Sequence, residues 1–298
     1  WTLFRFLNPG LLGSREQFGR NYAIPIEKNQ DSVALDRLRR IVRPFILRRL
    51  KAQVLTELPP RTEIEISVEL PPQSRAFYEA LRRDSLERLA ELKGTPGQTQ
   101  IQILAEITKL RLACCSPQLV NPDTTLQSAK MPAFLEIVDE LRENGHRALV
   151  FSQFVKHLTL LRGVLDRQGV SYQYLDGSTP AKARAARVTA FQEGNGDLFL
   201  ISLKAGGTGL NLTAADYVVH MDPWWNPAVE DQASDRAHRI GQERPVTIYR
   251  IVARDTIEDR IIALHREKRK LVDGLLADTA MPKAVSAEEL IALLREDM

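Results

Sequence analysis

The strongest chemical signal in the sequence is a pair of arginines near residue 236. Gln232, Arg236 and Arg239 are spaced i, i+4 and i+7, so a helix through them would place all three on one face. Each guanidinium keeps its charge and offers a planar fork of donors, so two that project together suit a polyphosphate. The alternative is a solvent-exposed helix in which Asp231 and Asp235 pair with the arginines.

A glycine-rich stretch, residues 204–212, follows a strand pattern and is a second candidate for phosphate contact. Gly207 and Gly209 tolerate positive φ and let backbone N–H groups approach a ligand closely. A plain tight turn would use the same residues, so both interpretations stay open.

Two of the three tryptophans, Trp224 and Trp225, lie between a strand pattern and a helix pattern. Core packing suits one of them, and the other is a candidate to stack on a base or a sugar. His220 lies in an apolar strand pattern and is expected to be structural. His238 lies between the two arginines and is a candidate to orient them.

Several catalytic constellations are missing from the sequence. It has no Gly-Lys dipeptide and therefore no Walker A phosphate loop, and its one Asp-Glu dipeptide lies in a helix pattern poorly suited to bind magnesium. Cys114 and Cys115 are adjacent and are the only cysteines, which excludes a disulfide framework and a cysteine-rich zinc site. We predict that both are small buried hydrophobes at the end of a helix, and we predict no metal site.

From residue 131 onward, strand patterns alternate with helix patterns at short spacing. The apolar runs do not alternate with polar residues, which is typical of strands buried on both faces. We therefore predict an α/β fold with a parallel sheet covered by helices. The predicted strands are 147–152, 170–175, 197–202, 217–222 and 246–252, and the predicted helices are 154–167, 180–192 and 227–238.

Ligands of such sheets bind at the carboxyl ends of the strands. The residues predicted to stand at those ends are polar or glycine, which is unusual directly after a buried strand. They are Ser152, Gln153, Gly177, Ser178, Ser202, Lys204 and Asp222.

The first half of the chain has a different texture. Residues 36–51 form a basic amphipathic run interrupted by Pro44, either a solvated face or a linker that contacts phosphates. Residues 62–70 alternate as in a half-exposed strand. Two helix patterns joined by a turn at 94–98 then predict a helical hairpin. A charged helix over 256–273 and an acidic helix over 286–296 are predicted to close the chain.

The composition is that of an ordinary globular protein. Hydrophobic residues make up 44% of the 298 residues, and no run approaches the roughly 18 apolar residues of a membrane span. The net charge of +3 is too small to indicate a nucleic-acid partner by itself. The chain begins with Trp1 in an apolar stretch, so we expect it to be a piece of a longer protein.

Five strings together resemble the carboxyl half of the Snf-type DNA-translocating ATPases of helicase superfamily two, in the family's order and spacing. They lie at residues 148–154, 174–179, 202–212, 222–227 and 232–242. The resemblance implies a second RecA-like lobe, with a parallel sheet and helices on both faces, plus an inserted helical hairpin and an N-terminal helical segment. The implied segments are a first-lobe tail and linker (1–58), a strand and helical protrusion (59–129), the second lobe (130–255) and a C-terminal helical brace (256–298).

The resemblance also implies residue roles around ATP with Mg²⁺. The phosphate-loop lysine and the magnesium-binding acids would lie on a first lobe, while Arg236 and Arg239 act as arginine fingers with support from Gln232. Gly207 and Gly209 would pass close to the nucleotide. The implied DNA contacts are Ser152, Gln153, Gly177, Ser178, Ser202, Lys204 and Trp225.

The implied activity is ATP-dependent translocation on double-stranded DNA, through sequence-independent backbone contacts. The implied partners are duplex DNA, the first RecA-like lobe and a DNA-bound protein as substrate, with no membrane. The compartment would be the nucleoid region of the cytoplasm in a prokaryote and the nucleus in a eukaryote. The alternatives are a sugar-nucleotide enzyme on a similar sheet, and a non-catalytic DNA-binding or interaction module.

Overall fold

The computed structural model describes residues 1–29, 31–46, 58–91, 96–205, 209–266 and 294. The chain divides into two compact units, Trp1–Thr56 and Glu57–Met298, called unit 1 and unit 2. Within the described ranges, no helix has both the length and the apolar character needed to cross a membrane.

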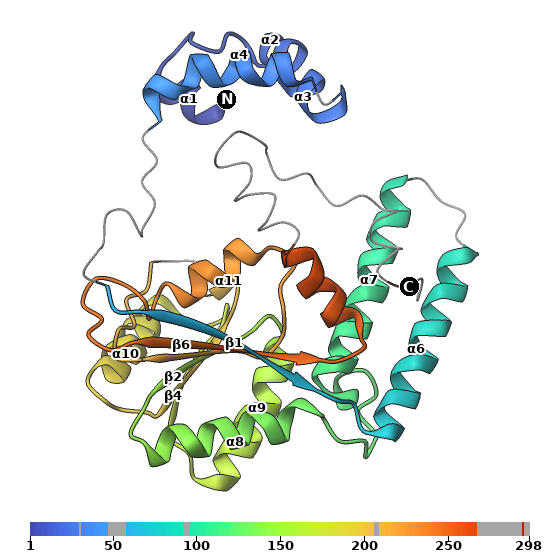
Figure 1. The fold of residues 1–298 in the computed structure, drawn as a ribbon, viewed down its shortest axis with the longest axis vertical. Coiled ribbons are helices and arrows are strands. Elements are labelled where there is room, and N and C mark those ends of the chain that lie inside the picture. The colour runs from blue at the N-terminus through green and yellow to red at the C-terminus, as the bar shows by residue number, and fades with distance from the viewer. Residues whose placement is uncertain (30, 47–57, 92–95, 206–208, 267–293, 295–298) are drawn as a thin grey trace. The chain divides into compact units, whose positions relative to one another are not determined.

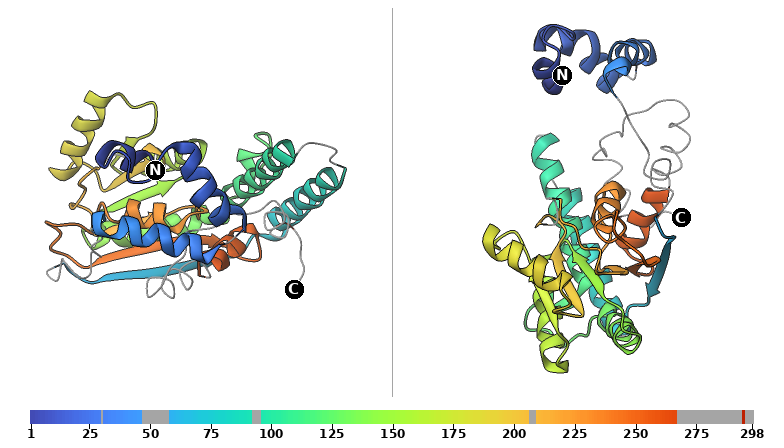
Figure 2. Two further views of the ribbon diagram at one scale, coloured as in Figure 1. Left: turned by 90° about the horizontal axis from the view of Figure 1, so that it is seen from above. Right: turned by 90° about the vertical axis from the view of Figure 1, so that its left-hand side faces the viewer.

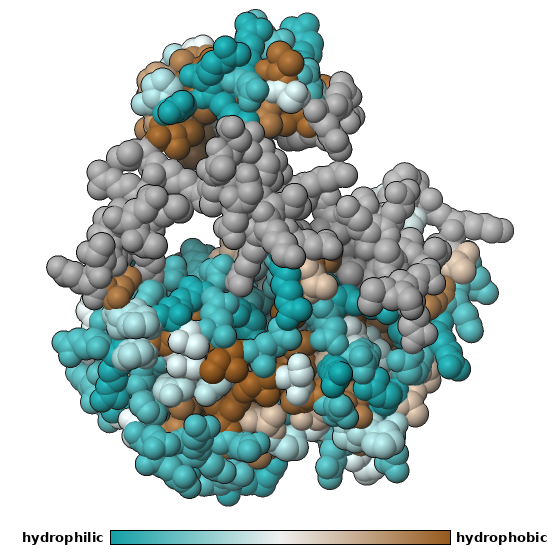
Figure 3. Space-filling view, viewed as in Figure 1, coloured by the Kyte–Doolittle hydropathy of each residue, from teal (hydrophilic) through white to brown (hydrophobic). Residues whose placement is uncertain are grey.

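Unit 1 consists of short helices with exposed apolar side chains. Asp31 caps its longest helix by accepting hydrogen bonds from the N–H groups of Val33 and Ala34, at 2.9 and 3.0 Å. Figure 3 shows hydrophobic residues in brown among hydrophilic ones in teal. The elements are α1 (Thr2–Leu7), α2 (Arg15–Phe18), the π-helix η1 (Gly19–Ala23), α3 (Ile24–Asn29), α4 (Ser32–Val42) and the 3-10 helix η2 (Arg43–Phe45).

The predicted basic run is only partly described. Its first portion forms the end of α4, and Pro44 lies in η2, where it breaks the helix as expected. Residues 47–51 lie outside the described residues.

Unit 2 is built on one six-stranded sheet in which every neighbouring pair is parallel (Figure 1). The strand order is β1-β6-β5-β2-β4-β3. The strands are β1 (Arg61–Val68), β2 (Ala148–Ser152), β3 (Tyr172–Leu175), β4 (Leu198–Ser202), β5 (Tyr217–His220) and β6 (Val246–Ala253). The predicted parallel sheet is confirmed.

Helices cover both faces of the sheet because successive strand residues point to opposite sides. Ala148 and Val150 of β2 pack in one core cluster with α8 (Lys130–Glu143) and α9 (Val155–Gln168). Leu149 and Phe151 pack in another with α10 (Ala181–Gln192) and α11 (Pro227–Ser234). In Figure 1, α8 and α9 lie below the sheet, α11 lies above it, and α10 is seen at the left beside the ends of the strands.

The predicted helical hairpin is confirmed as α6 (Pro72–Ala90) and α7 (Pro96–Cys115), followed by the 3-10 helix η3 (Pro117–Leu119). The two helices lie side by side in the left view of Figure 2. Their core cluster includes Ile103, Ile107 and Leu110, together with Ile257 and Ile261 from the helical residues 257–266. The cysteines end α7 as buried free thiols, as predicted.

One strand has a place that the sequence did not predict. The half-exposed strand 62–70 is β1, which pairs with β6 from Arg61↔Val246 to Val68↔Ala253 and forms an edge of the same sheet. The predicted helix 256–273 is described only to residue 266, and 286–296 lies outside the described residues except for Leu294. The four segment boundaries drawn from the resemblance stay predictions.

Candidate functional site

The candidate residues lie on two opposite sides of the sheet. One side is formed by the carboxyl ends of the strands and is called the carboxyl edge, and the other is formed by their amino ends. Ser152 and Ser202 are register partners at the carboxyl ends of β2 and β4. The arginine segment, residues 235–242, lies instead beside the amino ends of β1 and β5. The reason is that α11 follows β5 and runs back across the sheet, as the crossover of a parallel sheet must.

The prediction that Gln232, Arg236 and Arg239 share one helical face is wrong. Helix α11 ends at Ser234, and residues 235–241 form turns. Packing against the chain before β5 overrides the helical spacing. The side-chain amide of Gln242 donates to the carbonyls of Thr213, Ala215 and Ala237, and the N–H of Leu212 donates to the carbonyl of Arg236.

Arg236 is a buried cation without a described counter-charge. The residue is only 6% exposed, and its Nε and Nη1 have no hydrogen-bond partner among the residues that the structure describes. Burial lowers its pKa, and the positive charge of Arg239 lowers it further. A buried guanidinium in such surroundings is stabilised by an incoming anion. Arg239 and Gln232 are exposed.

The two acids that the alternative interpretation pairs with these arginines form ion pairs with a residue of β1. Asp231 and Asp235 pair with Arg61 of β1, at 2.8 and 3.5 Å. The Nε2 atom of His238 lies 2.8 Å from the carbonyl oxygen of Pro59, so the imidazole contacts the segment before β1. These contacts hold the arginine segment to the amino end of β1.

His220 is structural, as expected. It is buried in β5, stacks on Phe151 and lies 2.9 Å from the hydroxyl of Ser234. Burial lowers the pKa of His220 to about 4, so the ring is neutral at physiological pH.

The glycine-rich stretch is described only in part. Gly207 lies outside the described residues. Gly209 has φ of +42°, in the left-handed region that favours glycine, and a Cβ built there would meet no atom within 4 Å.

At the carboxyl edge, the predicted DNA contacts differ in exposure. Ser152 and Ser202 are buried. The hydroxyl of Ser152 donates to Asp222, and that of Ser202 accepts from the N–H of Ala205 at 3.4 Å. The Ser152 hydroxyl therefore bonds to the loop after β5, and the Ser202 hydroxyl bonds to the loop after its own strand. Lys204, Gly177 and Ser178 are exposed, and Gln153 is half-buried.

Asp176 fixes the exposed turn that carries Gly177 and Ser178. It accepts hydrogen bonds from the N–H and the hydroxyl of Ser178, at 2.9 and 2.7 Å, and from the hydroxyl groups of Tyr174 and Thr179. Burial raises the pKa of Asp176, but these hydrogen bonds outweigh it and lower the pKa to about 2. The carboxylate stays ionised at physiological pH and holds the turn.

Both tryptophans of the pair are half-buried, so burial alone does not divide them into a core residue and a stacking residue, and the stacking role stays a prediction. Trp224 packs against the core cluster of α10 and α11, and its backbone N–H donates to the carboxylate of Glu230 at 2.7 Å. Trp225 packs against the hairpin core. Both rings flank Arg111, a residue of α7 that the sequence analysis did not single out. A cation in the apolar stretch Leu110–Ala113 was the available signal.

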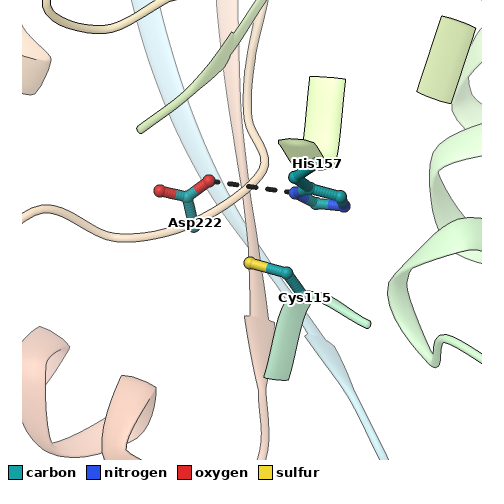
Figure 4. Close-up of side chains that lie close together, drawn as sticks. All are labelled: Cys115, His157 and Asp222. Atoms are coloured by element: carbon teal, nitrogen blue, oxygen red, sulfur yellow. Dashed lines mark ion pairs between the residues drawn. The ribbon is translucent and has the colours of Figure 1, made fainter. Parts of the chain in front are cut away.

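A second unexpected grouping includes Asp222, two residues before Trp224 in the sequence. Figure 4 shows Cys115, His157 and Asp222 facing one another, with their ligand-type atoms within 4.8 Å. They suit a metal ion poorly. Asp222 already accepts hydrogen bonds on both oxygens, Arg111 lies 3.8 Å from it, and burial raises the pKa of the Cys115 thiol well above its usual value.

The fold and these strand-end residues define a RecA-like lobe, and comparison with known proteins agrees. Residues 1–119 match the SNF2-related domain, and residues 129–241 match the Helicase conserved C-terminal domain. An uncharacterized ATP-dependent helicase of Mycoplasma pneumoniae is 40% identical over 98% of this chain and 28% of its own length. The putative ATP-dependent helicase/translocase YwqA of Bacillus subtilis is 35% identical over 97% of this chain and 32% of its own.

Solved structures give the same result. The Sulfolobus solfataricus SWI2/SNF2 ATPase core in complex with dsDNA matches with a TM-score of 0.64 and 30% identity, over 98% of this chain and 60% of that one. The chain belongs to the Snf2-type family of helicase superfamily two and corresponds to the carboxyl-terminal half of its ATPase core. It spans about a third or less of the length of the two curated relatives.

Proposed function

We propose that this chain acts in an ATP-dependent double-stranded DNA translocase, to which it supplies the arginine fingers and part of the DNA groove. Two relatives are named ATP-dependent helicases, and one structural neighbour is a SWI2/SNF2 ATPase core in complex with dsDNA. These names support the activity class. The partners would be duplex DNA, a first RecA-like lobe and a DNA-bound protein, and the compartment would follow the organism.

The observation that carries the proposal is the buried guanidinium of Arg236, which has no counter-charge among the residues that the structure describes. Its Nε and Nη1 lack partners among the described residues, and Arg239 adds positive charge nearby. Such a pair suits the β- and γ-phosphates of ATP. Phosphoryl transfer needs positive charge on the transferring group, and an arginine finger supplies about 10³–10⁵ in rate.

The remaining half of the site would come from elsewhere. The sequence has no Gly-Lys dipeptide, so the phosphate-loop lysine and the acids that bind Mg²⁺ are assigned to the first lobe. Gly207 and Gly209 would then pass the nucleotide, with Gln232 in support. The two lobes would close on ATP and reopen after hydrolysis. This cycle would shift the DNA-contacting surface of one lobe relative to that of the other and move the protein along the duplex.

The DNA groove is assigned to the carboxyl edge of the sheet. Gly177, Ser178 and Lys204 are exposed there and would contact the phosphate backbone, with Gln153 and Trp225 beside them. Ser152 and Ser202 are buried, so we assign them an indirect role in shaping the same edge. Backbone contact predicts binding that is independent of sequence and weakens with salt.

The test is ATP hydrolysis by the full-length protein with and without duplex DNA. We expect duplex DNA to stimulate hydrolysis, and Arg236→Ala and Arg239→Ala each to reduce the stimulated rate by about 10³-fold or more while DNA affinity is largely kept. Arg244→Ala is the matched control, since Arg244 is an exposed arginine that pairs with Asp216 at 3.3 Å. Normal turnover of the Arg239→Ala protein would refute the finger role.

A second measurement addresses the non-catalytic alternative. Residues 1–298 alone should show no hydrolysis above background, because half of the proposed site is absent. Hydrolysis by this chain alone would contradict a divided site. A full-length protein that binds duplex DNA but never hydrolyses ATP would favour a binding module.

A further inference from the structure

Arg111 of the hairpin lies beneath the loop that joins β5 to α11. Its side chain is 1% exposed, its Nη2 donates to the carbonyl oxygen of Pro223, and the same atom lies 3.8 Å from Oδ1 of Asp222. The hairpin and this loop are separated by more than a hundred residues of sequence. One side chain thus ties α7 to the segment that follows β5.

Three aromatic rings surround the same guanidinium. Its Cζ lies 5.3 Å from the ring centre of Phe154, 5.7 Å from that of Trp224 and 5.5 Å from that of Trp225. These distances are within the range of cation–π attraction. Nε and Nη1 have no hydrogen-bond partner among the described residues, and attraction to the ring faces compensates for those missing hydrogen bonds. A planar cation is needed for this packing, which an ammonium group would not reproduce.

Asp222 extends the connection to the end of β2. One of its oxygens accepts from the hydroxyl of Ser152 and the other from the N–H of Gln153, at 3.1 Å. The hydroxyl of Ser152 also accepts from the N–H of Phe154, at 3.1 Å. Burial opposes ionisation of Asp222, yet His157, Arg111 and Ser152 lower its pKa.

We propose that Arg111 is a positioning residue, through which the helical hairpin sets the geometry of the DNA-facing strand end at Gln153 and of Trp225. The inference rests on the proposed function, because it concerns the same DNA groove. It assigns the hairpin a specific internal task, which is to hold one guanidinium between three rings and a carboxylate. Loss of the guanidinium frees the loop and the strand end together.

The test separates DNA recognition from nucleotide use in the full-length protein. We expect Arg111→Met to raise the KM for duplex DNA by about tenfold or more, with the KM for ATP within twofold of wild type. Arg111→Lys keeps the charge but not the planar fork, so its KM for DNA should lie between the two. Lys109→Met is the matched control on the same helix, since Lys109 pairs with Asp84 outside this network.

Hydrogen exchange gives a readout that does not depend on activity. In both Arg111 variants, the amides of residues 152–154 should exchange faster by about tenfold or more, while those of β4 keep their protection. This result would hold even if the wild-type protein showed no DNA-stimulated hydrolysis, which would refute the proposed function alone. If Arg111→Met does not fold, Arg111→Lys decides. An Arg111→Lys protein with wild-type exchange and wild-type KM for DNA would overturn the proposal.

Discussion

Arg111 and Arg236 are two buried arginines in the same chain with opposite surroundings. Arg111 has a carboxylate, a carbonyl and three aromatic rings around it. Arg236 has no described hydrogen-bond partner for two of its nitrogens, and its charged neighbour is Arg239, of the same sign. The first arginine is paired within the protein's own interior, whereas the second has no counter-charge among the described residues, and we propose that an anion supplies it. Burial alone therefore does not distinguish a structural cation from a candidate ligand-binding one, and the presence or absence of a counter-charge is the difference between these two arginines.

Lys130 is a third buried cation, and like Arg111 it is paired inside the protein. Its removal is expected to have the largest effect on stability. It is fully buried, lies 2.6 Å from Oε2 of Glu258 and donates to the carbonyls of Met221 and Ile251. Lys130→Met would leave Glu258 buried without its partner, so we expect a loss of about 5 kcal/mol in the free energy of unfolding. Urea unfolding measures it. The double variant Lys130→Met/Glu258→Leu should recover most of the loss, and a double variant as unstable as the single one would contradict this explanation.

Arg111→Met should lower the free energy of unfolding by less than Lys130→Met, because Nη2 of Arg111 lies 3.8 Å from Oδ1 of Asp222, farther than Lys130 lies from Glu258. We expect about 3 kcal/mol, from the unpaired Asp222 and the lost contacts with the rings. The same urea titration measures it. Lys109→Met, at a half-buried position whose ion pair with Asp84 lies outside this network, is the control and should change the unfolding free energy by less than about 1 kcal/mol. Equal stability of the Arg111→Met and wild-type proteins would contradict the view that Arg111, unlike Arg236, stabilises the fold through internal partners.

His220 shows a third way to bury a titratable group, which is to keep it neutral. Burial lowers its pKa to about 4, against 6.5 in the unfolded chain. Between these values the unfolded state binds the proton and the folded state does not, so stability falls as the pH falls. We expect this group to remove about 2 kcal/mol between pH 8 and pH 5. Unfolding of His220→Gln over the same pH range should show a shallower slope, and an unchanged slope would exclude His220 as the cause.

Arg236→Met should change stability least. Removal of a buried charge that lacks a counter-charge relieves a desolvation cost, so we expect the unfolding free energy to stay the same or to rise by about 1 kcal/mol. Urea unfolding of residues 1–298 measures this change, with the Arg236→Met and Arg111→Met proteins compared under the same conditions. A loss of stability as large as that of Arg111→Met would show that Arg236 has an internal counter-charge, and the comparison would fail.

The sheet was predictable because its strands are short apolar runs bounded by turn residues. The observed strands β2 and β4 begin within one residue of the predicted positions and end where predicted. The end of α11 was not predictable from spacing. Residues 235–239 keep a helical pattern, and only the hydrogen bonds of Gln242 to the chain before β5 show why the helix stops.

The polar network around Asp222 was also beyond sequence reasoning. Its members come from α7, β2, α9 and the loop after β5, and no local pattern brings them together. The same limit applied to β1, whose partner β6 lies far along the chain. Long-range pairing leaves no mark on the alternation of a single strand, so the sequence showed the strand without its place.

The pairing of β1 with β6 has a consequence for how unit 2 is made. Arg61 is synthesised long before its partner Val246, and at about 5–20 residues per second the ribosome needs about 10–40 seconds to bridge the gap. During that interval β1 is an unpaired edge. Its outward glutamates, Glu63 and Glu65, later pair with Arg250 and Arg266. Until then we expect their charge to discourage aggregation of the nascent chain, so that the same carboxylates protect the strand first and anchor it afterwards.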